Sequence, residues 1–154
     1  MRLVHGLVCA VAVALVAPTV IAQDAGEKDR VMAGGGIKAA GWTAKIDAAA
    51  AGKGAKVTDS KFVQQGNDFV LNIGPAAIYW NPKNVAKGDY TVKATIKNLK
   101  SNAGHPHSAG LFIGGANLED DAAATATYCV AYTNGGALVR QLTGPKATTI
   151  FGGN

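Results

Sequence analysis

Short apolar segments separated by turn residues restrict what this chain can fold into more than any other feature of the sequence. Between residues 61 and 151 these segments recur at close spacing, with glycine, proline or asparagine between them. The pattern is typical of β-strands joined by tight turns, and no long stretch has the 3.6-residue period of an amphipathic helix. The sequence therefore predicts an all-β fold, an antiparallel sandwich or barrel. The predicted strands are 62–63, 69–73, 76–80, 90–97, 108–113, 127–133, 137–143 and 148–151.

The segment 90–97 has the strictest alternation of apolar and polar residues. Successive side chains of a strand point to opposite faces, so we expect the apolar set to face a core and the polar set to face water. Because Lys93 is expected at the surface, Lys93→Ala should change stability by less than about 0.5 kcal/mol. The apolar set is Tyr90, Val92, Ala94 and Ile96, and the polar set is Thr91, Lys93, Thr95 and Lys97.

Glycine-containing turns are expected to join two pairs of strands into hairpins. Gly66-Asn67-Asp68 forms the first turn and Asn134-Gly135-Gly136 the second, since glycine tolerates the positive φ of tight turns. The continuously apolar segment 76–80 predicts a strand covered on both faces. One helical turn could form over 48–51, before two glycines stop it.

Residues 1–22 have the layout of a cleavable secretory signal. Arg2 supplies a positive start, an apolar run covers 3–16, and cleavage is expected after Ala22. An uncleaved membrane anchor is the alternative, but polar residues from Gln23 onward end the run short of the roughly 20 residues that a span needs. We therefore expect an exported protein, periplasmic or secreted, without membrane attachment after cleavage.

The remaining chain is long enough for one domain with a modest core. Residues 23–40 read as a flexible leader because they are polar and carry a triple glycine, and residues 41–154 read as the sandwich domain. Removal of Arg2 lowers the formal charge from +5 to +4. The lysines are dispersed, which does not match the basic patch of a nucleic-acid-binding protein. Cys9 leaves with the signal, so Cys129 has no partner for an internal disulfide.

The strand predicted over 148–151 is followed only by Gly152-Gly153-Asn154. This arrangement leaves the last predicted hairpin without a second arm and one sheet edge open. An incomplete domain, truncated at its C-terminus, and a frayed polar tail both explain it.

Four segments read in order give the chain a recognisable pattern. They are Gly41-Trp42-Thr43, the segment 74–82, Gly88-Asp89-Tyr90, and the segment 110–115. Together they resemble exported bacterial proteins related to the 3-keto-disaccharide hydrolase domain, formerly a domain of unknown function. The resemblance covers residues 41–154 and implies a concanavalin A-like (LamG-like) jelly-roll sandwich that runs on beyond Asn154. The family's acidic motif before the Gly-Trp pair is absent from 36–40, so no catalytic residue carries over.

Aromatic residues are the candidates for contact with sugars, because a flat ring buries the apolar face of a pyranose. Trp42 and Tyr132 belong to this set, with a core position expected for Trp42. Tyr79 and Trp80 are adjacent on a predicted strand and so point to opposite faces. One of the two should face outward, and we select Trp80 as the ligand-binding residue with Tyr79 beside it. Trp80→Ala should then weaken sugar binding by about 1 kcal/mol or more.

Metal-binding and catalytic chemistry has weaker support in the sequence. His105 and His107 could share a metal with Glu119 or Asp120, but solvated loop histidines explain them as well. Asp120-Asp121 could hold calcium, although no motif supports it. A glycosidase needs two converging carboxylates, and no motif selects a pair. The available acids are Asp47, Asp59, Asp68, Asp89, Glu119, Asp120 and Asp121.

Three functions remain open from the sequence. The leading one is an exported carbohydrate-associated sandwich that binds glycans or has no catalytic role. The second is a glycoside hydrolase acting on 3-keto-disaccharides, which the resemblance implies. The third is a structural or protein-binding module of the cell envelope.

Overall fold

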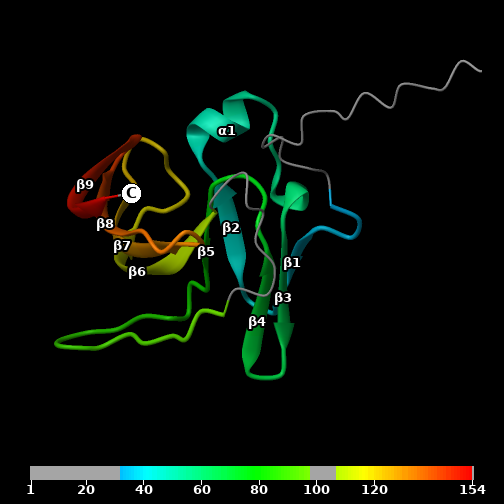
Figure 1. Cartoon of the computed structure of the whole chain (residues 1–154), viewed down its shortest axis with the longest axis horizontal. Helices are drawn as coiled ribbons and strands as arrows, with labels where there is room; N and C mark the ends of the chain where they lie inside the picture. Colours follow the sequence, from blue (N-terminus) through cyan, green and yellow to red (C-terminus); the bar gives the residue numbers. More distant parts are fainter. Residues whose placement is uncertain (1–31, 98–106, 154) are drawn as a thin grey trace, which may run out of the picture.

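The computed structural model describes residues 32–97 and 107–153. Within them, strands account for 47% of the structure and helix for 7%, in three sheets, which confirms the predicted all-β sandwich class (Figure 1). The proposed signal at 1–22 and the first part of the leader lie outside the described residues. No helix in the described ranges is long and apolar enough to cross a bilayer.

The N-terminal half contains two small sheets. β1 (Gly36–Lys38), β3 (Lys61–Gln65) and β4 (Asp68–Asn72) form the first, in the order β1-β3-β4. The β3–β4 pair is the hairpin expected around Gly66, which has a φ of 61°. β2 (Thr43–Ile46) and β5 (Ala77–Trp80) form the second, antiparallel sheet. All four residues of β5 are half-buried.

Two short helical elements connect these strands. α1 (Ala48–Gly52) is the predicted helical turn, and the carboxylate of Asp47 caps it by accepting from the backbone of Ala49 and Ala50. The 3-10 turn η1 (Val57–Asp59) precedes β3, and its buried Asp59 accepts from the backbone N–H of Lys56 at 2.8 Å. These bonds supply partners for amides that short helices leave unpaired.

The leader predicted over 23–40 is wrong at its C-terminal end. Residues 36–38 form β1, which pairs in parallel with β3, and Ala39 is buried. The triple glycine explains the error, because glycine allows close packing as well as flexibility. A Cβ at Gly35 would overlap the carbonyl oxygen of Thr58. Here the glycine permits backbone to approach backbone.

Four aromatic rings form the centre of the N-terminal half. Phe62 is 6% exposed, and its ring centroid lies 5.1 Å from those of Trp42 and Phe69 and 4.9 Å from that of Tyr79. Trp42 also lies 4.8 Å from Phe69. The core position expected for Trp42 therefore agrees with its ring contacts.

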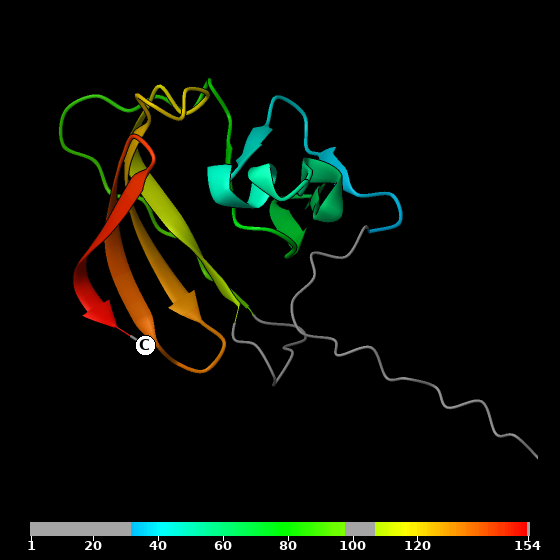
Figure 2. The same ribbon diagram turned by 90° about the horizontal axis from the view of Figure 1, so that it is seen from above.

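The C-terminal half is one antiparallel sheet in chain order (Figure 2). Its strands are β6 (Ser108–Ala116), β7 (Thr125–Tyr132), β8 (Ala137–Thr143) and β9 (Lys146–Gly153). The turn between β7 and β8 is the predicted one, and Gly135 there has a φ of 92°. β6 and β7 approach so closely that a Cβ at Gly110 would overlap the carbonyl oxygen of Cys129.

The segment 148–151 differs from expectation in its pairing. It belongs to β9, which is itself the second arm of a hairpin with β8. The hairpin turns at Gly144, whose φ is 57°. The outer edge of β9 has no strand partner among the described residues, and its Phe151 is 75% exposed. An open edge is present there, as predicted, within those residues.

The prediction of a half-buried strand over 90–97 is wrong. The segment is extended but forms no strand, and its apolar set is exposed, including Tyr90 at 46%, Val92 at 48% and Ile96 at 53%. Alternation specifies two faces but not a partner, and residues 90–95 make no backbone hydrogen bond among the described residues. The segment belongs to a long arm that leaves β5 (green, Figure 1).

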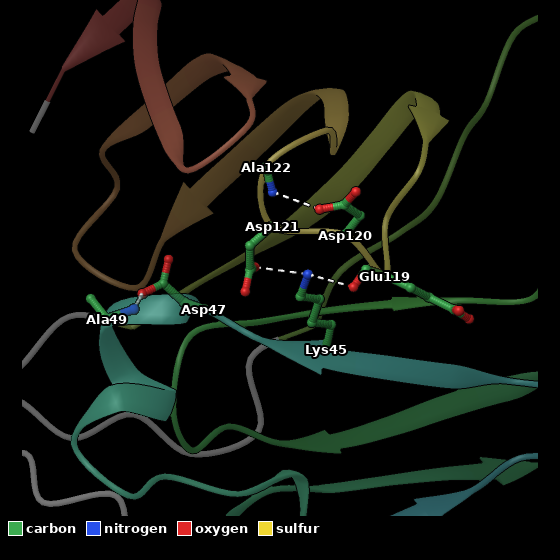
Figure 3. Close-up of polar contacts among 7 residues, drawn as sticks. All are labelled: Lys45, Asp47, Ala49, Glu119, Asp120, Asp121 and Ala122. Atoms are coloured by element: carbon green, nitrogen blue, oxygen red, sulfur yellow. Dashed lines mark hydrogen bonds and ion pairs between the residues drawn. The ribbon is translucent and has the colours of Figure 1, made fainter.

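A lysine on β2 joins the two halves. Lys45 Nζ lies 2.8 Å from a carboxylate oxygen of Asp121 and donates to the carbonyl of Glu119 at 2.9 Å (Figure 3). Both partners belong to the loop between β6 and β7. Lys45 therefore connects β2 to the loop that joins two strands of the four-stranded sheet.

Candidate functional site

A hollow of about 940 Å³ lies between the extended segment 90–95 and one face of the four-stranded sheet. Strand register explains its floor. Leu111, Cys129 and Val139 lie directly opposite one another across β6, β7 and β8, and therefore share a face. Ile113 and Thr127 form the next row on that face. The lining residues among those that the structure describes are Tyr90, Thr91, Val92, Lys93, Ala94, Thr95, Leu111, Ile113, Thr127, Cys129 and Val139.

The hollow combines an apolar floor with a polar wall. Leu111 and Val139 are half-buried and Ile113 is exposed, so hydrocarbon surface remains accessible on the sheet. The wall is formed by residues 90–95, which include two threonines, Lys93 and the partly exposed Tyr90. The backbone amides and carbonyls of 90–95 have no hydrogen-bond partner among the described residues, so they can pair with a ligand. The site can bind an amphipathic molecule.

The electrostatics of the hollow are one-sided. Among residues 32–97 and 107–153, its lining includes Lys93 as the cationic residue and contains no Asp or Glu. Among the described residues, the ion pair is between Lys45 and Asp121, and Lys93 has no carboxylate partner. The thiol of Cys129 is free and exposed, as expected for a cysteine without a disulfide partner.

Comparisons of the chain with protein-family models, curated proteins and solved structures give no match.

The structure places Tyr79 and Trp80 outside the hollow. Tyr79 belongs to the aromatic cluster, where its ring stacks on Phe62 with an interplanar angle of 26°. Its hydroxyl lies 2.5 Å from that of Ser60, which itself donates to the carbonyl of Val57. Burial raises the pKa of Tyr79 above its usual 10.0, and the Ser60 hydrogen bond offsets part of that rise.

Trp80 lies on the other face of β5. Trp80 lies opposite Thr43, and Ile78 lies opposite Lys45. These four residues therefore share one face of the β2–β5 sheet, the face from which Lys45 reaches the loop between β6 and β7. Trp80 is half-buried there. Its role in sugar binding stays a prediction.

The acids serve local structure in several cases (Figure 3). Asp47 caps α1, Asp120 accepts from the backbone N–H of Ala122 at 2.9 Å, and Asp121 pairs with Lys45. Across residues 32–97 and 107–153, no three His, Cys, Asp or Glu side chains are grouped as metal ligands. His107 is half-buried before β6, whereas His105 lies outside the described residues.

The opposite face of the four-stranded sheet is held by an arginine. Arg140 Nη2 donates to the carbonyl of Ala147 at 2.7 Å, and its guanidinium carbon lies 6.0 Å from the ring centroid of Tyr128. Burial raises the pKa of Tyr128, while the positive charge of Arg140 opposes that rise. These contacts hold Arg140 against the sheet on the face opposite the hollow.

Sequence reasoning missed the wall of this site. Tyr90 and its neighbours have the alternation of a core strand, so their polar members were expected to face bulk water and their apolar members a dry interior. The signal available in the sequence is the turn pair Gly88-Asp89 immediately before Tyr90. A turn redirects the chain but does not specify which surface it then crosses.

Proposed function

We propose that the protein is an exported, carbohydrate-associated β-sandwich that binds glycans in the hollow between 90–95 and β6–β8. The observation that carries the proposal is the apolar floor beneath residues 90–95, whose backbone groups have no partner among the described residues and which include two threonines and Lys93. A pyranose has C–H groups on its faces and hydroxyls around its edge, so both parts of the site have a counterpart. The volume of about 940 Å³ falls within the usual range for small-molecule sites.

Tyr90 is the residue best suited to stack on a sugar. It lines the hollow and is 46% exposed, so a face of its ring can be reached. Aromatic contacts contribute about 0.5–1.5 kcal/mol beyond the area they bury. The signal-like N-terminus and the resemblance to 3-keto-disaccharide hydrolase proteins both support a carbohydrate role outside the cytoplasm.

The test is a binding screen of the chain after Ala22 against neutral and acidic plant and bacterial oligosaccharides, followed by titration calorimetry. Tyr90→Ala should weaken binding about five-fold or more, equivalent to about 1 kcal/mol. Tyr90→Phe keeps the ring and should bind nearly as well as the unaltered protein. Val85→Ala is the control on the same arm, since Val85 is exposed and outside the hollow. Binding to no oligosaccharide, or unchanged binding by Tyr90→Ala, would contradict the proposal.

Two further measurements separate this proposal from its alternatives. If Trp80→Ala weakens binding and Tyr90→Ala does not, the ligand lies at β5 and not in the hollow. Incubation with a 3-keto-disaccharide tests hydrolysis directly, and release of free sugar above the buffer rate would replace binding by catalysis as the function.

A further inference from the structure

We propose that the hollow selects anionic sugars, with Lys93 binding the acidic group; this inference rests on the proposed glycan-binding function. The charge of the lining carries it. In the described part of the lining Lys93 is the cationic residue and there is no Asp or Glu, so a carboxylate in the hollow meets attraction without opposing repulsion from these residues. A neutral sugar gains nothing from this ammonium beyond an ordinary hydrogen bond.

Lys93 is available for such a ligand. Among the described residues no carboxylate lies within ion-pair distance of it, whereas Lys45 is held by Asp121. The Lys93 ammonium therefore does not have to break an internal ion pair before it binds a ligand. Lysine supplies three donors and a compact positive charge, which suits a carboxylate of variable orientation.

The neighbouring groups fit the remainder of an acidic sugar. Thr91 and Thr95 line the hollow on either side of Lys93 along the chain, and their hydroxyls can bond to ring hydroxyls. Leu111 and Val139 present apolar surface for the C–H face of the ring. A uronic acid, which has a carboxylate at one edge of a pyranose, matches this set of groups.

The test compares acids with their own neutral esters. Tetragalacturonic acid and tetramannuronic acid are titrated against the protein at low salt, each beside its fully methyl-esterified form. The acids should bind about two- to five-fold more tightly than the esters, as expected for a partly solvated ion pair. The difference should shrink in 0.5 M sodium chloride because salt screens the pair.

Lys93→Gln should lower the affinity for the acids to that of the esters and leave the esters unaffected. Lys97→Gln is the matched control, because it removes the same charge from the same arm outside the hollow. Circular dichroism and the melting temperature of both variants verify that the fold is retained.

The outcomes distinguish this inference from the function on which it rests. Equal binding of acids and esters, binding of neutral oligosaccharides alone, or equal effects of the two lysine variants overturns acid selection and leaves glycan binding intact. Binding of no oligosaccharide of either kind overturns both. A fall of acid affinity to the ester level in Lys93→Gln, but not in Lys97→Gln, supports both.

Discussion

Removal of the Phe62 side chain is the sharpest test of how the N-terminal half is held together. Phe62 is 6% exposed and contacts the rings of Trp42, Phe69 and Tyr79, which come from three different segments. Phe62→Ala therefore opens a cavity at the point where β3, β4 and β5 meet. Neighbouring rings are large and mutually packed, so we expect them to fill little of that space.

The expected loss follows from the area that the ring buries. A buried phenylalanine removes about 200 Å² from water, which at about 25 cal/mol/Å² corresponds to about 5 kcal/mol. Denatured chains keep roughly 10–40% of such surface covered, so the net value falls to about 3–4.5 kcal/mol. Phe→Ala substitutions in protein cores cost about 3–5 kcal/mol. Since whole domains are stable by about 5–15 kcal/mol, this single change should remove a large share of the stability.

Urea denaturation followed by tryptophan fluorescence measures the effect, because Trp42 lies beside the deleted ring. Val85→Ala serves as the control, since Val85 is 73% exposed and should change the free energy of unfolding by less than about 0.5 kcal/mol. A loss below about 1 kcal/mol for Phe62→Ala, with an unchanged denaturant slope, would refute the aromatic core as described.

Three further results are expected. Gly110→Ala should lower the free energy of unfolding, measured in urea, by about 1–3 kcal/mol, because the added Cβ overlaps the backbone of β7. Gly52→Ala is the control: the space around Gly52 is open, so this change should leave the free energy of unfolding unaltered or raise it by up to about 1 kcal/mol. The raised pKa of Tyr79 favours the neutral phenol in the folded state. The contribution of Tyr79 to the free energy of unfolding is therefore constant below about pH 10 and is lost as pH rises through the folded pKa. Tyr79→Phe should flatten this alkaline loss of stability, which denaturation between pH 8 and 12 measures. A double-mutant cycle of Lys45→Ala and Asp121→Ala should give a coupling of about 0.2–1 kcal/mol, because the Asp121 side chain is 57% exposed; a coupling of zero would show that this ion pair does not hold the halves together.

Local patterns in the sequence were sufficient to predict two of the hairpins. β3 and β4 flank a glycine turn, and β7 and β8 flank another, so each strand finds its partner a few residues away along the chain. The same holds for α1, where alanines and a preceding Asp47 give both propensity and a cap. In these places the residues that make the structure are neighbours in sequence.

Features that depend on distant partners could not be predicted in the same way. The parallel pairing of β1 with β3 needs Gly35 to lie against Thr58, and a run of glycines gives no periodicity from which to infer it. The arm around Tyr90 has the alternation of a strand. It lies opposite a row of side chains that the register of β6, β7 and β8 brings together, and this register involves residues far from Tyr90 in the sequence. The candidate site was missed because it arises between two such segments.

The chain-order pairing of β6 to β9 has a consequence for how the protein folds. Each of these strands pairs with the next one along the chain through a short connection, so little chain entropy is lost when each pair closes. The β2–β5 pair instead joins residues 31 to 37 positions apart, from Ile46↔Ala77 to Thr43↔Trp80. Short-range contacts form faster than long-range ones. During refolding, the amides of the four-stranded C-terminal sheet should therefore become protected from hydrogen exchange before those of the N-terminal half. The inner strands β7 and β8, bonded on both sides, should then be the slowest to exchange their amide hydrogens.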